Sequence, residues 1–147
     1  MTSYTGAWSG AEAAAFLDAN PVPIRLSCHT PAGDLWMLSL WFRFHDGRFQ
    51  CATGADADVV RFLKADPSVA FEVSTNEPPY KGVRGRGSAT ITPDEDKTVL
   101  RALVERYLGD PETAPGPRLL SADRKEVTIT IDPDRVYSWD FTARMSE

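Results

Sequence analysis

Residues 22–53 alternate between apolar and polar side chains over three successive segments, and this pattern limits the chain to a fold built from paired β-strands. Apolar residues recur at every second position in 22–30 and again in 35–45. A period of two turns one set of side chains into a core and leaves the other set outside. Asp46-Gly47 then predicts a tight hairpin into a return strand over 48–53, because both residues tolerate a positive φ.

The remaining chain alternates short helices with further strands. Two helices are marked by capping boxes that begin at Ser9 and at Thr92, each followed three residues later by glutamate. A third helix is expected over 56–64, with Asp56 as its N-cap. Further strands are expected at 69–75, 82–92, 127–131 and 135–141, with a long loop at 110–124. Hairpin-connected strands with helices at their ends favour a mainly β (α+β), mostly antiparallel barrel with capping helices.

Length and composition predict one domain in a reducing compartment. The chain has 147 residues, enough to bury a core without a metal or a disulfide. We expect a single domain over 1–147, with residues 1–8 loose. Apolar runs stay well short of the ~18 residues of a membrane span, and the first ten residues lack a signal-peptide pattern. Cys28 and Cys51 lie in strand-like runs and are expected to be buried, reduced thiols in a cytoplasmic protein.

The charge distribution singles out one segment. A net charge of −5 argues against nucleic-acid binding, yet residues 80–87 carry three cations and no acid. In a strand, Arg84 and Arg86 share one face, while Gly85 and Gly87 share the other. Two arginines on one face suit a phosphate or a carboxylate. The alternative is a solvated edge strand whose arginines pair with surface acids.

Other candidate sites are weaker. His29 and His45 are the only histidines, and neither has the spacing of a metal cluster or of a catalytic triad, so no metal is expected. One of them could still serve as an axial haem ligand, because haem needs only one proximal donor. Residues 51–56 end a strand and open a helix, which forms either an anion site or a plain turn. Four aromatic residues suit either a flat ligand or the core: Trp36, Trp41, Phe42 and Phe44.

Four segments in order carry a family resemblance: Leu40-Trp41-Phe42, His45-Asp46-Gly47-Arg48, Ala52-Thr53-Gly54 and residues 61–70, RFLKADPSVA. Together they resemble the pyridoxamine 5′-phosphate oxidase-like split-barrel superfamily, most of all its flavin/deazaflavin oxidoreductase branch. The resemblance extends over residues 10–141. It implies a six-stranded antiparallel split β-barrel with flanking helices, and a homodimer with two cofactor sites at the interface.

The resemblance also implies a chemistry. The cofactor would be coenzyme F420 or FMN, with haem as an alternative, and a hydride would pass to or from a small organic substrate. The cofactor carries such a reaction, so no side chain is expected to be catalytic. The resemblance implies that Ser39 and Trp41 line the cofactor ring, and that Thr53, Gly54 and Arg61 bind its phosphate. It also implies that Tyr80 and Lys81 lie where the partner subunit approaches the ring. Arg84, with Lys81, is expected to meet anionic groups.

One position departs from the family pattern. The family commonly has a lysine or an arginine two residues before the position of Arg61, where this chain has Val59. Arg61, Lys81, Arg84 or Arg86 would then have to supply the missing charge. Three hypotheses follow: a reductase using F420 or FMN, a binding protein for haem or another flat anion, and a dimer without a cofactor.

Overall fold

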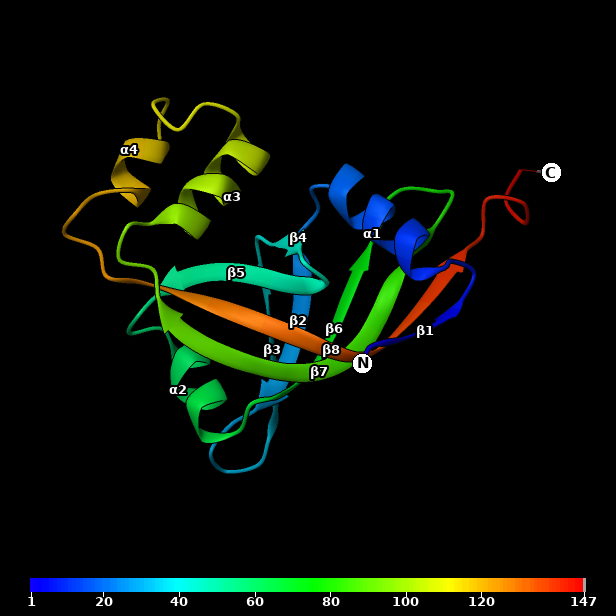
Figure 1. The fold of residues 1–147 in the computed structure, drawn as a ribbon, viewed down its shortest axis with the longest axis horizontal. Helices are drawn as coiled ribbons and strands as arrows, with labels where there is room; N and C mark the ends of the chain where they lie inside the picture. The colour runs from blue at the N-terminus through cyan, green and yellow to red at the C-terminus, as the bar shows by residue number, and fades with distance from the viewer. Residues whose placement is uncertain (147) are drawn as a thin grey trace.

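The computed structural model describes residues 1–146 and consists of eight strands and four helices (Figure 1). The strands are β1 (Ser3–Gly6), β2 (Ile24–His29), β3 (Leu35–Leu40), β4 (Arg43–His45), β5 (Arg48–Gly54), β6 (Ser68–Ser74), β7 (Lys81–Pro93) and β8 (Glu126–Asp140). The helices are α1 (Gly10–Ala19), α2 (Asp58–Ala65), α3 (Thr98–Leu108) and α4 (Gly116–Leu119). Within residues 1–146, no helix combines the length and the apolar character needed to cross a membrane.

The strands form one sheet that curls into a barrel. Their order is β3-β2-β6-β7-β8-β5-β4, with antiparallel neighbours throughout, and β1 adds to β8 in parallel. β3 and β4 lie at opposite ends of this order although only Trp41 and Phe42 separate them in sequence. The chain therefore joins the two ends of the sheet, which brings the sheet round on itself.

The prediction of a single strand over residues 35–45 is therefore wrong at one point. The backbone breaks at Trp41–Phe42, where the hydroxyl of Tyr107 accepts a hydrogen bond from the Phe42 amide at 3.1 Å. The same hydroxyl contacts the Phe42 carbonyl at 3.2 Å. These bonds replace the ladder bonds that a continuous strand would make.

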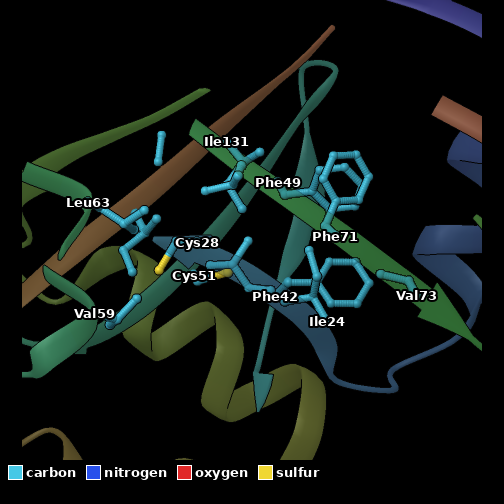
Figure 2. Close-up of a cluster of buried hydrophobic side chains, with 14 of the residues drawn as sticks. Ile24, Cys28, Phe42, Phe49, Cys51, Val59, Leu63, Phe71, Val73 and Ile131 are labelled. Carbon is cyan, nitrogen blue, oxygen red and sulfur yellow. The ribbon is translucent and has the colours of Figure 1, made fainter. Parts of the chain in front are cut away.

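The barrel interior is filled by the inward-facing residues of the alternating strands. Phe49 lies at the centre, with its ring centroid 4.7 Å from that of Phe71 and 4.9 Å from that of Phe44. Figure 2 shows the two thiols, Cys28 and Cys51, among these apolar side chains. Both are free, as expected, and burial raises the pKa of Cys51 to about 12.

The helices pack against separate parts of the barrel. α1 begins with the expected capping box, in which Ser9 and Glu12 bond each other's backbone N–H. α2 packs against β2 and β7, and its Phe62 meets the ring of Trp36 edge-on at 5.1 Å. α3 packs mainly against β5 and also contacts β8. Arg106 of α3 donates to three carbonyls at the end of α1, where the helix itself has no basic residue.

Three further expectations are corrected by the structure. The N-terminal residues are not loose, because β1 pairs with β8 and the Trp8 amide donates to the Ser138 hydroxyl. The two strands expected at 127–131 and 135–141 are one strand, β8, whose pairing with β7 shifts at a bulge near Pro133. Proline lacks an N–H and is tolerated there without ending the strand. The long loop at 110–124 contains the short helix α4.

The second capping box is also wrong. Residues 92 and 93 still belong to β7, and α3 begins later, after Lys97. Asp94, which is buried, accepts hydrogen bonds from the amides of Val99 and Leu100 and so caps the helix from outside it. The expected N-cap of α2 is displaced as well, from Asp56 to Ala57, whose side chain offers no cap.

Candidate functional site

The best-defined feature near the expected site is an aromatic stack at the break between β3 and β4. The rings of Trp41 and Tyr107 are 5.1 Å apart and 7° from parallel. The Tyr107 hydroxyl donates to the Val22 carbonyl at 2.9 Å and accepts from the Phe42 amide. Burial raises the pKa of Tyr107, so the hydroxyl keeps its proton at neutral pH. The Trp41 ring is therefore a fixed plane rather than a mobile surface side chain.

Trp41 also borders an open pocket. The pocket has a volume of about 300 Å³ and is lined by Pro23, Ser39, Leu40, Trp41 and Ala52. The structure thus brings together Ser39 and Trp41, two of the residues expected to line a cofactor ring. Thr53 follows Ala52 on β5 but lies on the opposite face of the strand, which it shares with the buried Phe49 and Cys51, so it does not line this pocket.

The turn from β5 into α2 has free backbone donors but mixed charge. The N-cap of α2 makes no side-chain hydrogen bond, and the Val60 amide donates to the Ala57 carbonyl at 3.1 Å. Among residues 1–146, the amides of Asp58 and Val59 remain available to an anion. Gly54 lines a pocket of about 460 Å³ with residues 55–57 and 123–126. The acids of this pocket are Asp56, Asp123 and Glu126, against the cations Arg124 and Lys125. Side chains in this pocket therefore supply no excess positive charge.

The basic residue missing at position 59 leaves Arg61, two residues later, as the nearest cation on α2. Val59 is 1% exposed and packs in the core, so this position cannot reach an anion outside the barrel. Arg61 is exposed on the same helix and pairs with Asp58 at 2.9 Å. Its guanidinium also lies 5.0 Å from the centre of the Phe62 ring. An exposed pair of this kind contributes little to stability, so Arg61 remains able to turn toward a ligand.

Tyr80 and Lys81 lie elsewhere, at the start of β7. Tyr80 is 43% exposed, and its carbonyl accepts from the Phe141 amide. Lys81 lies opposite Asp140 in the β7–β8 register. Hydrogen bonds from Thr142 hold the pKa of Asp140 below its usual range, and the charge of Lys81 adds to this effect.

Arg84 belongs to a third region, the outer face of the sheet. It lines an open groove of about 700 Å³, the largest of those described here. Its guanidinium lies 4.5 Å from the ring centre of Tyr137 and 5.5 Å from that of Trp139. The eight expected site residues therefore do not share one pocket: Ser39 and Trp41 line one, Gly54 a second and Arg84 a third.

Two residues that the sequence pattern did not mark contribute to these surfaces, one beside Trp41 and one in the groove of Arg84. Tyr107 supports the Trp41 plane, but the pattern of α3 marks it only as one more apolar helical position. Arg135 lies beside Arg86 across the β7–β8 ladder, a contact that depends on the strand register. No local signal in the sequence could have found either of them.

The two histidines lie at different ends of the sheet and form no cluster. His29 ends β2, where its Nδ1 lies 3.6 Å from a carboxylate oxygen of Asp66 and finds no hydrogen-bond partner among residues 1–146. His45 is exposed in the hairpin before β5, 3.3 Å from Asp46. Among residues 1–146, no group of three His, Cys, Asp or Glu side chains is placed to hold a metal ion.

Solved structures share this architecture. The conserved hypothetical protein Rv2991 from Mycobacterium tuberculosis superimposes with a TM-score of 0.74 and 25% identity, over 91% of this chain and 86% of that one. An F420 reductase superimposes with a TM-score of 0.69 and 24% identity, over 82% and 93% of the two chains. A protein from Listeria innocua assigned as a pyridoxamine 5′-phosphate oxidase gives a TM-score of 0.66 and 14% identity, over 88% and 96%.

The chain has the split-barrel fold of pyridoxamine 5′-phosphate oxidase-like proteins. Split barrels with similar structures differ in what they hold. An FAD-binding protein from Mesorhizobium loti matches with a TM-score of 0.63 and 19% identity, and the haem storage protein HutZ from Vibrio cholerae with 0.64 and 13%. No protein-family model matches the sequence, and no curated protein does. These likenesses to the FAD-binding protein and to HutZ concern the fold that they share with this chain.

Proposed function

We propose that this protein is a flavin- or deazaflavin-dependent oxidoreductase that transfers a hydride to or from a small organic substrate. The observation that carries the proposal is the Trp41 plane, fixed by Tyr107 beside an open pocket. A rigid aromatic surface next to a pocket suits a flat ring system. The split-barrel fold, shared with an F420 reductase and an FAD-binding protein, supports the same class of cofactor.

The residues present fit such a cofactor in a defined way. Ser39 and Trp41 would flank the ring, and Thr53, Gly54 and Arg61 would hold the phosphate with the free amides of α2. When bound, the cofactor would supply the hydride donor or acceptor. The chain's own residues would bind and orient the ring and keep water from it, with no side chain required to transfer a proton.

We further propose that the site is completed by a second copy of the chain. Tyr80, Lys81 and Arg84 lie apart from the Trp41 pocket, so they would reach the cofactor from the partner of a homodimer. A large apolar side chain at the start of β3 supports a covered surface, because Leu35 is 79% exposed. A reducing, cytoplasmic setting is in keeping with the two free thiols.

The proposal is tested by titrating the purified protein with F420, FMN and FAD and following ligand fluorescence. One of these ligands should bind, and Arg61→Ala should weaken its binding by about tenfold, as expected for a lost charged hydrogen bond. Lys64→Ala is the matched control, because Lys64 is exposed on the same helix near its other end. Absence of binding by all three ligands would refute the proposal.

Haem is the second candidate, and the burial of Val59 favours it, because a porphyrin does not require the phosphate clamp that this position weakens. His29 and His45 would be the axial donors available in the described chain. A haem titration should then give a Soret band that shifts when the responsible histidine is replaced by alanine. A band unchanged in the variant lacking both histidines would exclude an axial role for them.

A further inference from the structure

The outer face of β2, β6, β7 and β8 carries two rows of side chains, of which the proposed cofactor site uses only Arg84. Cross-strand register aligns them as Arg25, Glu72, Arg84 and Tyr137 in one row, and Ser27, Ala70, Arg86 and Arg135 in the next. All eight line one open groove of about 700 Å³. The two rows are two residues apart along each strand, roughly 7 Å.

The groove holds an excess of positive charge. It contains four arginines and one acid, Glu72, a net of +3 in a chain whose total is −5. Among residues 1–146, none of these arginines forms an ion pair. The Arg25 side chain donates to the Pro23 carbonyl at 3.3 Å, and the Glu72 carboxylate accepts from the Ser74 hydroxyl. The groove is therefore a concentrated cationic site on an acidic molecule.

One pair of like charges in the groove destabilises the fold. Arg86 lies directly opposite Arg135 in the β7–β8 ladder, immediately before the register shift at Gly87. Like charges directly opposite each other on one face of a sheet are destabilising. An anion placed between the two guanidinium groups would convert this repulsion into attraction.

The shape of the groove limits what fits. Ser27 and Ala70 have small side chains and leave a shallow floor beside Arg86, while Met37 and Tyr137 stand at the sides. Met37 is 63% exposed and Tyr137 is 41% exposed. The floor of the groove spans only these two rows of side chains. The rest of the chain carries a net charge of −8, which is the total of −5 minus the +3 of the groove. A long polyanion would meet that negative surface beyond the groove, whereas a small anion would not.

We propose that the groove is a binding site for a small multivalent oxyanion, such as a phosphate or polycarboxylate, held between Arg86 and Arg135 and flanked by Arg25 and Arg84. Planar guanidinium groups bind such oxyanions through paired hydrogen bonds. The inference goes beyond the proposed oxidoreductase activity and does not depend on it. Arg84 is shared with the proposed cofactor site, so the test rests on Arg86 and Arg135.

Binding is measured by calorimetry on the cofactor-free protein at low salt, with inorganic pyrophosphate and citrate as separate probes. Sodium chloride at equal ionic strength is the control for screening. At least one probe should bind with one ion per groove, and Arg86→Ala and Arg135→Ala should each weaken it about tenfold or more. Arg101→Ala, an exposed arginine on α3, should leave the affinity unchanged. Binding of pyrophosphate alone or of citrate alone identifies the class and supports the site.

Thermal unfolding distinguishes an arginine that binds an anion from an arginine with a purely structural role. Without an anion, Arg86→Ala should melt at the same temperature as the parent protein or higher, because it removes the repulsion with Arg135. With pyrophosphate or citrate, the parent should gain stability and the variant should not. A variant that melts lower without any anion, or a parent that binds neither probe at millimolar concentration, would overturn the proposal. Because no cofactor is present, these results are independent of the flavin titrations.

Discussion

Replacing Tyr107 with phenylalanine removes one oxygen atom and with it the hydrogen bonds that join α3 to the break between β3 and β4. In the parent protein this hydroxyl lies 2.9 Å from the Val22 carbonyl, 3.1 Å from the Phe42 amide and 3.2 Å from the Phe42 carbonyl. It has one hydrogen to donate, so the two carbonyls share it, and it accepts from the amide. The variant therefore loses two full hydrogen bonds at a point where Phe42 is fully buried.

The expected loss of stability follows from these contacts. An ordinary hydrogen bond contributes about 1 kcal/mol net, whereas a buried amide left unpaired costs about 1–3 kcal/mol. Together they predict that Tyr107→Phe lowers the free energy of unfolding by about 2–4 kcal/mol. The same change should weaken cofactor binding, because Trp41 loses the anchored ring on which it stacks.

Urea unfolding at pH 7 measures this difference, with Tyr137→Phe as the matched control. Tyr137 is 41% exposed and makes no side-chain hydrogen bond among residues 1–146, so its variant should differ from the parent by less than about 0.5 kcal/mol. Burial raises the pKa of Tyr107 above 10.0 in the folded protein. Its contribution is therefore complete below pH 10 and shrinks as the pH rises further. Equal destabilisation by both variants would refute the argument.

Three further predictions concern single residues. Cys51, with its pKa raised to about 12, should not react with thiol reagents at pH 8 until the protein unfolds, as mass spectrometry would show. The Ser68 amide lowers the pKa of Asp66, so Asp66→Asn should reduce the melting temperature at pH 7, and the difference should vanish as the pH falls below 3.8. Gly85→Ala would force a Cβ onto the backbone of β8 and should lower the free energy of unfolding by about 2 kcal/mol or more. Gly54→Ala, whose added Cβ meets no described atom within 4 Å, should leave it unchanged, and urea unfolding compares the two variants.

Local signals in the sequence were sufficient where the structure depends on neighbouring residues. The Ser9 capping box forms as predicted because both of its partners lie within one helical turn. The alternation over residues 24–29 correctly divides the strand between core and surface. The mainly β, antiparallel fold with flanking helices follows from such signals taken together.

Distant contacts account for what the sequence could not show. The break at Trp41–Phe42 depends on Tyr107, 65 positions after Phe42. The Pro133 segment has the residues of a turn, but pairing with β7 on both sides keeps it in one strand with a bulge. Thr92 could not cap α3 because β7 extends past it.

The candidate site shows the same division. Alternation places Arg84 and Arg86 on one face, but the sequence cannot reveal that Arg135 lies opposite Arg86, because register depends on pairing between distant strands. The departure at Val59 was visible in the sequence. Only the packing of α2 shows that its side chain lies in the core and cannot approach an anion.

The claim that a cofactor is held between two copies of the chain is tested most directly by mixing two defective variants. Arg61→Ala would damage the site from one protomer, and Lys81→Ala would damage it from the partner. Coexpressed, they should form mixed dimers with one intact site, so that about one site in four regains full affinity for F420 or FMN. Mixing Arg61→Ala with the double variant is the control and should restore nothing. If the first mixture also restores nothing while each variant alone binds weakly, the site lies within a single chain and the account is contradicted.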